Sequence, residues 1–365
     1  MSLRFFEGQF QLLKEAFNIT ALSSDRQKLT EFGNSHDILI HHIPMRRGIS
    51  PFCDIYSLFC LCRFLIKEHP FIVHGNTPKA SFLSMIAAKI AKVPVRIYMC
   101  HGLRYQSCRG MIRSLLVFAE RITCRCATDI VCVSNGLKDV LVNEKISEKE
   151  PIVIWNGSVS GIDIDKFNPD KIHKQSDIRS RFGLSPSDFV VTFVGRLVRD
   201  KGVNELVEAF SSVSNKYPNI KLLLVGPFEK EGNKLSRETL SAIDRNQSII
   251  AAGIQDNIPE ILSATDVFIL PSHREGFGLS LMEAGAMGVP SIATNIIGCN
   301  EIIENEKTGL LIPPYSAVAI EEAIERLFID KSLYESIHHR CRDSIISRYE
   351  QRHLWSFFKD YYLSR

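Results

Sequence analysis

Short apolar segments alternate with longer amphipathic segments along almost the whole chain, and this alternation limits the possible folds more than any other feature. The apolar segments are rich in Val, Ile and Leu: DILIHHI, FIVH, VRIYMC, DIVCVS, FVVTFVG, IKLLLVG, SIIAAG, DVFILP and PSIAT. Strands of this kind are buried on both faces, so we expect an α/β fold with parallel sheets covered by helices. The expected helices are 51–67, 78–92, 110–127, 203–217, 257–265, 279–288 and 316–328.

The length of 365 residues and a break in the pattern indicate two domains. Glycines and a proline interrupt the segment 154–170, and a fresh series of strands and helices begins at Phe189. We place an N-terminal domain at 1–160 and a C-terminal domain at 161–349. The last segment, about 350–365, predicts an aromatic-rich helix that packs back on the N-terminal domain.

The N-terminal domain opens on SLRFFEGQFQLLKEAF, which predicts a loop that enters a helix. A doubly wound domain ordinarily begins with a strand in the interior of its sheet. We therefore expect either that the native protein starts several residues upstream or that the sheet has a gap where its first strand should be.

The sequence contains no apolar run long enough to span a bilayer and no signal-peptide pattern at its start. The longest candidate, at 54–67, contains Arg63 and ends at Lys67, so we interpret it as a buried helix. The ten cysteines form no Cys-x-x-Cys pair, which favours reduced thiols in a cytosol over a metal or redox site. These features predict a cytoplasmic protein.

The net charge of +3 conceals an uneven distribution. Residues 1–150 carry 20 Lys and Arg against 13 Asp and Glu, a net +7, whereas residues 151–365 carry a net −4. Such a basic surface is either simply solvated or attracted to an anionic membrane or a phosphorylated substrate. The segment 111–126 mixes apolar and basic residues, and it fits an interfacial helix and a buried helix with basic edges equally well.

The segment FVGRLVRDKGV at 193–203 places two cations after a strand. The strand ends at Gly195, and Arg196 and Lys201 follow before the next helix begins. The planar fork of an arginine and the compact charge of a lysine suit the two phosphates of a diphosphate. In this position such side chains are also commonly just solvated.

The segment HREGFGLSLMEAGAMG at 273–288 carries two glutamates with seven residues between them. Glu275 lies in the loop after a buried strand, where open α/β sheets bind ligands, and Glu283 lies in the early turns of the following helix. Phosphate oxygens can be held by the backbone N–H groups at the helix start, which belong to Gly278, Leu279 and Ser280. Glu283 can accept hydrogen bonds from a ribose diol, and Glu275 from a sugar at the other end of the ligand. In the alternative interpretation Glu283 only favours the helix N-terminus, and Glu275 is a surface acid.

Histidines stand at the ends of two strands in the N-terminal domain. His101 follows VRIYMC, where it can contact a phosphate or a reacting sugar, or serve as a hydrogen-bonded turn residue. His74 has the same placement at the end of FIVH. We assign His74, Lys79 and Arg104 to the acceptor side.

The order and spacing of these segments resemble glycosyltransferase family 4, the retaining glycosyltransferases of the GT-B fold. The resemblance covers most of the chain and is strongest over 190–315. GRLVRDKG resembles the diphosphate-binding segment of the family, EGFGLSLME its Glu-x7-Glu motif and NGSVSGIDIDKFNP its interdomain segment. AAGIQDNIPEIL and NEIIENEKTGLLIPP are further similar stretches. The first strand of the family and part of the loop after it are absent, so contacts from that loop are not carried over.

The resemblance implies two Rossmann-like doubly wound domains that face a central cleft, the N-terminal one binding the acceptor and the C-terminal one the nucleotide sugar. It implies diphosphate contacts for Arg196 and Lys201, a sugar contact for Glu275 and a ribose contact for Glu283. Further donor contacts are implied near the phosphates and the base, for Gly161, Gly253 and Ile254.

The implied reaction is transfer of a sugar from a nucleotide diphosphate sugar, expected to be UDP-linked, with retention at the anomeric carbon. The cations would stabilise the departing diphosphate, so we expect neither a metal nor another cofactor. The residues expected to carry the catalysis are Glu275, His101, Arg196 and Lys201.

Together with the basic N-terminal domain, the resemblance implies a lipid-linked or saccharide acceptor in bacterial capsule, O-antigen or other surface polysaccharide synthesis. It also suggests peripheral binding to the anionic inner face of the plasma membrane, with no nucleic-acid partner. Two alternatives remain: a UDP-sugar epimerase of the GT-B fold and an inactive protein that binds nucleotide sugars. An NAD dehydrogenase is disfavoured because no Gly-x-Gly-x-x-Gly follows an early strand.

Overall fold

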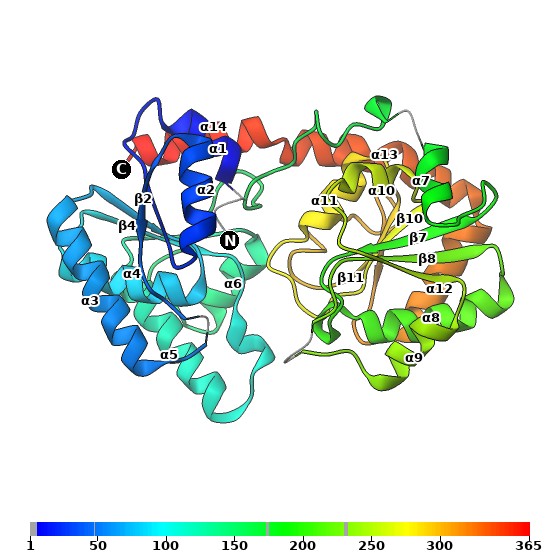
Figure 1. The fold of residues 1–365 in the computed structure, drawn as a ribbon, viewed down its shortest axis with the longest axis horizontal. Helices are drawn as coiled ribbons and strands as arrows, with labels where there is room; N and C mark the ends of the chain where they lie inside the picture. Colours follow the sequence, from blue (N-terminus) through cyan, green and yellow to red (C-terminus); the bar gives the residue numbers. More distant parts are fainter. Residues whose placement is uncertain (1–5, 47, 173–174, 230–232) are drawn as a thin grey trace. The chain divides into compact units, whose positions relative to one another are not determined.

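The computed structural model describes residues 6–46, 48–172, 175–229 and 233–365, and the chain divides into two compact units (Figure 1). Unit 1 consists of Met1–Gly161 and Arg352–Arg365, and unit 2 consists of Ile162–Gln351. The named strands of both units pair in parallel, as the alternation of apolar and amphipathic segments predicts.

The strands of unit 1 form two separate sheets. The larger sheet has the order β3 (Ile72–Gly75), β4 (Val95–Cys100), β5 (Asp129–Cys132) and β6 (Ile152–Val153). The smaller sheet pairs β1 (Thr20–Ser23) with β2 (Leu39–His42). In the described part of unit 1 no strand joins the two sheets, which agrees with the expected gap in the N-terminal sheet.

Three helices of unit 1 lie side by side. They are α3 (Pro51–Glu68), α4 (Pro78–Ile90) and α5 (Gly110–Cys126). α4 contacts β3 and β4 and packs against both α3 and α5 (Figure 1). Proline opens α3 and α4 because its fixed φ suits the first turn of a helix, where its missing N–H has no intrahelical partner anyway. The other helices of this unit are α1 (Glu7–Leu13), α2 (Arg26–His36), α6 (Asn135–Asn143) and α14 (Gln351–Leu363).

The C-terminal helix α14 packs against α1 and β3. The ring of Trp355 lies so close to Gly8 that a Cβ at that position would come within 1.9 Å of it. Tyr362 Oη lies 2.7 Å from His74 Nδ1, so the last helix also reaches the end of β3.

The segment 54–67 is not the buried helix that the sequence predicts. α3 buries Leu61 and Leu65 on one face and leaves large apolar side chains exposed on the other. α5 is not a buried helix either, because Met111 and Phe118 are exposed. Both faces of α3 are apolar in the sequence, and the packing of α4 and of the segment around Ile43 decides which one is covered. None of the described helices is long and apolar enough to cross a bilayer.

Unit 2 contains a six-stranded sheet in the order β12, β11, β10, β7, β8, β9. Its strands are β7 (Phe189–Val194), β8 (Ile220–Val225), β9 (Ile249–Gly253), β10 (Val267–Leu270), β11 (Ser291–Thr294) and β12 (Leu310–Ile312). The chain builds the sheet outward from β7 in one direction and, after a crossover, from β10 in the other. The loops after β7 and β10 therefore flank the topological switch point, where doubly wound sheets bind ligands.

The helices that follow β7 and β10 each pack against a helix from the C-terminal part of unit 2. α8 (Val203–Lys216) follows β7 and packs on α12 (Ala317–Ile329), and α11 (Leu279–Ala286) follows β10 and packs on α13 (Lys331–Tyr349). The remaining helices are α7 (Gln175–Arg181), α9 (Arg237–Arg245) and α10 (Ile258–Ser263).

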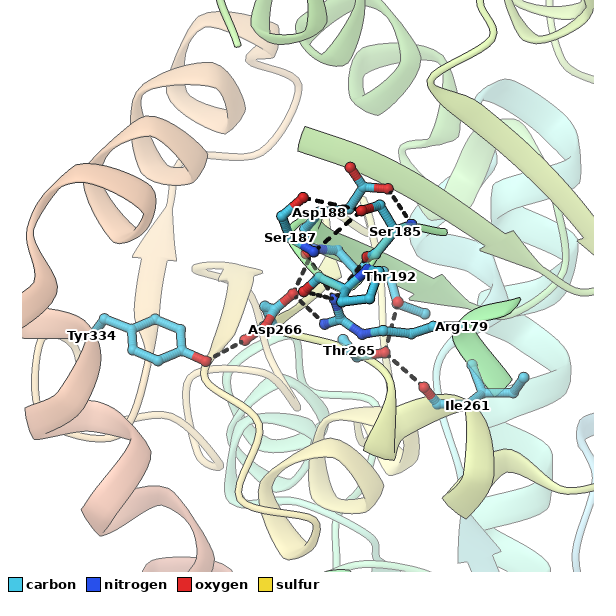
Figure 2. Close-up of polar contacts among 11 residues, drawn as sticks. Arg179, Ser185, Ser187, Asp188, Thr192, Ile261, Thr265, Asp266 and Tyr334 are labelled. Carbon is cyan, nitrogen blue, oxygen red and sulfur yellow. Dashed lines mark hydrogen bonds and ion pairs between the residues drawn. The ribbon is translucent and has the colours of Figure 1, made fainter. Parts of the chain in front are cut away.

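At the other end of the strands, where β7 and β10 begin, the side chain of Arg179 connects several segments (Figure 2). Its guanidinium donates to the carboxylate of Asp266 and to the carbonyl oxygen of Asp188, each at 2.8 Å. The same carboxylate accepts the N–H of Val190 at 2.7 Å, and Tyr334 donates to the Asp266 carbonyl at 3.2 Å. Burial raises the pKa of Asp266 despite this pairing, so the network maintains a partly buried charge at the base of the sheet.

Candidate functional site

The loops after β7 and β10 lie in direct contact. Gly202 has a φ of +70°, and a Cβ there would lie 1.9 Å from the carbonyl oxygen of Pro271. Only glycine allows both this left-handed backbone and this close approach. The N–H of His273 also donates to the carbonyl of Asp200 at 2.9 Å. The basic and acidic segments of the sequence therefore meet at the switch point of unit 2.

Lys201 and Glu275 form an ion pair across these two loops. The Lys201 ammonium donates to Oε1 of Glu275, and the hydroxyl of Ser272 donates to the same oxygen at 2.7 Å. The two side chains are 23% and 11% exposed, so the pair is screened only partly by water. Because both contacts use Oε1, they leave Oε2 of Glu275 for a ligand.

Arg196 does not join this ion pair. It lies at the end of β7 and donates to Glu229 Oε2 at 3.0 Å, with the two side chains 60% and 38% exposed. An exposed pair of this kind contributes little to stability. The Arg196 guanidinium can therefore exchange this partner for an anionic ligand at small cost.

The start of α11 offers fewer free N–H groups than the sequence predicts. The N–H of Gly278 donates to the carbonyl of Gly298 and that of Leu279 to the carbonyl of Phe277, each at 3.0 Å. These bonds arise because the loop folds tightly against residue 298, where a Cβ would lie 2.6 Å from the carbonyl oxygen of Gly276. In this structure the N–H groups of Gly278 and Leu279 are therefore already paired, and a phosphate would have to displace these bonds to use them.

Glu283 lies in the second turn of α11. Burial raises the pKa of its carboxyl to about 7, and the nearby Lys166 ammonium limits this rise. At neutral pH the carboxyl is therefore balanced between its two protonation states. A ligand that donates hydrogen bonds to it would hold the ionised form.

Gly253 and Ile254 lie at the end of β9. The carbonyl of Gly253 accepts the N–H of Gly226 at 2.8 Å, so this carbonyl is already in use. The space beside Gly253 is open, with nothing within 4 Å of the position of a Cβ. Ile254 is 71% exposed and presents an apolar surface suited to a flat ring.

The two histidines predicted at strand ends are neighbours in unit 1. His101 Nε2 lies 3.4 Å from Asn76 Oδ1. Burial lowers the pKa of His101 to about 4; burial and the charge of His101 lower that of His74 to about 3. Both rings are neutral at pH 7, so neither supplies a positive charge to a phosphate. The ring of His74 packs against Phe6 and Tyr362 inside the unit.

The other predicted residues of unit 1 differ in exposure. Lys79 pairs with Asp54 and donates to the carbonyl of Gly48, so it connects α4 to the first turn of α3 and to the segment before it. Arg104 is exposed in a short 3-10 helix, Arg104–Ser107. Gly161 has a φ of +67°, and its N–H donates to Ser158 Oγ at 3.2 Å.

Ser272 is the site residue that the sequence analysis misses. Its side chain is fully buried, and its hydroxyl helps to fix Glu275. The signal was present, since a hydroxyl at the end of a buried strand stands three residues before the acid. His273 also supports the loop, through Glu205 at 3.2 Å and the ring of Tyr315 at 4.0 Å between centroids. These two partners come from distant segments, and no sequence pattern predicts them.

Two family models match the chain in succession. "Glycosyltransferase Family 4" matches residues 11–159, and "Glycosyl transferases group 1" matches residues 174–343.

Two relatives are similar over almost their full lengths. The capsular polysaccharide biosynthesis glycosyltransferase CapM of Staphylococcus aureus is 33% identical over 363 residues, which covers 99% of this chain and 94% of the relative. The UDP-Gal:alpha-D-GlcNAc-diphosphoundecaprenol alpha-1,3-galactosyltransferase of Escherichia coli is 31% identical over 362 residues, covering 97% of this chain and 91% of the relative.

Solved structures also resemble the chain. Anabaena Alr3699/HepE in complex with UDP has a TM-score of 0.79 at 19% identity, covering 98% of this chain and 95% of that one. At this level of identity the likeness shows a common fold.

Proposed function

Because this chain belongs to glycosyltransferase family 4, we propose that it moves a hexosyl residue from a UDP-sugar to a lipid-linked saccharide in bacterial surface polysaccharide synthesis. The family membership rests on the two family models and on 33% identity over nearly the whole chain. The protein is a glycosyltransferase of the GT-B fold. The choice of donor, acceptor and residue roles below is our proposal.

The observation that carries the proposal is the pairing of Lys201 with Glu275 at the switch point of unit 2. It puts a cation and a hydrogen-bond acceptor together where a doubly wound sheet binds ligands. The UDP donor is supported by the UDP-Gal in the name of the E. coli relative and by the UDP bound to Alr3699/HepE.

In the proposed complex, Arg196 and Lys201 neutralise the diphosphate and the N–H of Ser280 adds a donor. Glu275, held through Oε1, accepts a hydroxyl of the transferred sugar at Oε2. Glu283 accepts the ribose hydroxyls. The backbone at Gly253 and Ile254 meets the base, and Gly161 approaches the phosphates.

The reaction that we propose retains the configuration of the sugar. The bond between the anomeric carbon and the phosphate oxygen breaks, and the acceptor hydroxyl oxygen bonds to the same face of that carbon. The acceptor proton passes to a phosphate oxygen of the departing UDP. Negative charge grows on the diphosphate as it leaves, and the cations Arg196 and Lys201 stabilise it most at that moment. His101, which is neutral, contributes a hydrogen bond rather than a charge.

We assign the acceptor to unit 1, with His74, Lys79 and Arg104 as candidate contacts. The name of the E. coli relative gives its acceptor as a sugar linked to diphosphoundecaprenol. Such an acceptor lies in a membrane, and the net +7 of residues 1–150 would attract the protein to the anionic inner leaflet. We therefore propose a cytoplasmic protein bound peripherally to that leaflet.

UDP release tests the proposal. The protein is incubated with a panel of UDP-hexoses and vesicles that carry an undecaprenyl-diphosphate sugar, and UDP and the lipid product are measured. We expect UDP release that requires both one donor and the acceptor. Conversion of the donor to an epimer without UDP release would contradict the proposal in favour of an epimerase. Donor binding without turnover would contradict it in favour of an inactive binding protein.

A further inference from the structure

The outer face of α3 is apolar where a surface helix is ordinarily polar. Its exposed side chains have exposed fractions between 50% and 89% and recur at helical spacing: Phe52, Ile55, Tyr56, Phe59 and Ile66. The buried residues Ser57, Leu61 and Leu65 lie on the other side of the helix. The exposed stripe is therefore additional to the face that holds α3 on the protein.

α5 presents a second stripe of the same kind. Its exposed apolar residues are Met111, Ile112, Leu115 and Phe118, with exposed fractions between 50% and 86%. Its opposite side is buried through Glu120, Thr123, Cys124 and Cys126. α4 packs between α3 and α5, so both stripes lie on the helical layer that covers one face of the larger sheet (Figure 1). We call these nine apolar side chains of α3 and α5 the apolar face.

Basic residues accompany the apolar face. Arg63 and Lys67 lie on the exposed side of α3. Arg109 immediately precedes α5, Arg121 lies within it, and both are exposed. Of the three acids on these helices, Asp54 pairs with Lys79, Glu120 is 8% exposed, and Glu68 at the end of α3 forms an exposed pair with Lys67 at 3.4 Å. An exposed pair of this kind is weak, so Lys67 can exchange it for a headgroup phosphate. Long basic side chains can extend to headgroups while neighbouring apolar groups enter the acyl region.

A second copy of the chain would fit this surface poorly. In a symmetric pair the same patch meets itself, so Arg63 and Arg121 would face a surface of like charge. A leaflet with anionic headgroups supplies an apolar interior for the apolar face and negative charges for the basic residues around it.

We propose that α3 and α5 insert the apolar face into an anionic leaflet, while Arg63, Lys67, Arg109 and Arg121 bind its phosphates. The inference rests on the proposed function only in that a lipid-linked acceptor lies in the same leaflet. It goes beyond attraction by the net charge, because inserted side chains hold the protein at salt concentrations that screen the basic residues. Unit 1 is thereby held at the depth where the headgroup of the acceptor is presented.

Vesicle binding by the full-length protein tests the face. The vesicles contain phosphatidylcholine and phosphatidylglycerol and no acceptor. We expect the variant with Phe59→Ser and Phe118→Ser to partition at least about tenfold more weakly than the parent, a difference of about 1.4 kcal/mol. The matched control carries Val318→Ser and Ile329→Ser on α12 of unit 2, two residues that are 64% and 62% exposed. It should bind like the parent, and the parent should retain part of its binding at high salt. Equal binding by the two double variants would overturn the inference.

Insertion depth gives a second measurement that does not depend on loss of binding. Phe118→Trp and Val318→Trp each add one indole, and lipids brominated on the acyl chain quench inserted indoles. We expect strong additional quenching at position 118 and none at 318. Failure of the added indole at 118 to be quenched by bound vesicles would overturn the inference. A dimer in the absence of vesicles that dissociates in the Phe59→Ser and Phe118→Ser variant would overturn it as well.

The failure of the inference and that of the proposed function are distinguishable. Transfer to a water-soluble acceptor analogue does not need the apolar face, so the double variant should keep this activity while it loses vesicle binding. A parent that binds vesicles through α3 and α5 but transfers no sugar would contradict the proposed function and still support the apolar face.

Discussion

Lys201 and Glu275 form an ion pair between the loop after β7 and the loop after β10, although 74 residues separate them in the sequence. Ser272 donates to the same carboxylate oxygen, and Gly202 gives the space in which the loops approach. The pair fixes an acid whose second oxygen is left for a ligand. Because both side chains are partly buried, removal of either leaves a charge without its partner.

Replacement of Lys201 tests the ion pair. Lys201→Met should lower kcat by about a hundredfold, because one fixed stabiliser of the departing diphosphate is lost. The measurement is UDP release with donor and acceptor. Lys216→Met is the matched control, since Lys216 also forms ion pairs in unit 2 but with Glu321 and Glu325 on α12. Equal activity of the two variants would show that Lys201 has no role in transfer.

Gly202 should tolerate no side chain. Gly202→Ala combines a left-handed φ with a clash at the carbonyl of Pro271, and should lower the free energy of unfolding by about 3 kcal/mol. Gly183 has a similar φ of +66° with open space around it, so Gly183→Ala should cost only about 1 kcal/mol. Urea unfolding compares the two. If both variants lose the same stability, the close approach of the loops is not what requires glycine at position 202.

Glu283 should make UDP-hexose binding depend on pH. Its pKa is raised to about 7 by burial, whereas the ribose hydroxyls would stabilise the ionised form. Below this pKa the carboxyl must release a proton on binding, so the Kd for a UDP-hexose, whose phosphates do not titrate in this range, should rise as the pH falls from 8 to 6, by up to about tenfold per unit. Titration calorimetry measures this. Glu283→Gln should bind more weakly at pH 8 and show a flat profile, whereas the exposed acid Glu304→Gln should keep the slope. A slope that survives in Glu283→Gln would assign the titration to another group.

The Arg179 network should affect stability without affecting the ligand. Arg179→Ala leaves the Asp266 carboxylate without its cation, and should lower the free energy of unfolding by about 3 kcal/mol. The network lies where β7 and β10 begin, whereas the proposed site lies where these strands end, so the Kd for UDP should stay the same. Arg181→Ala changes an exposed neighbour on the same helix and should cost little. A large change in UDP affinity for Arg179→Ala alone would contradict this separation.

Much of the fold is predictable from local pattern. The parallel strands of unit 2 and the helices after β7 and β10 follow from apolar runs and their punctuation by glycine. Arg196, Lys201 and Glu275 follow the carboxyl ends of β7 and β10, which lie at the same end of the sheet because the strands are parallel, and Glu283 lies in the helix that follows β10. The hydrogen bond from the Gly278 N–H to the Gly298 carbonyl was not predictable from local pattern, because it depends on a segment 20 residues away.

The sequence by itself determined the α/β class, the two units and the edge at which the site residues stand, because these depend on the period of apolar residues and on chain direction. Tertiary structure alone decided that Ser272 and Lys201 share one oxygen of Glu275, that Arg196 stands apart with Glu229, and which side of α3 is covered. These outcomes depend on which distant segments pack together. When a helix is apolar on two sides, its own sequence does not indicate which side its neighbours will bury.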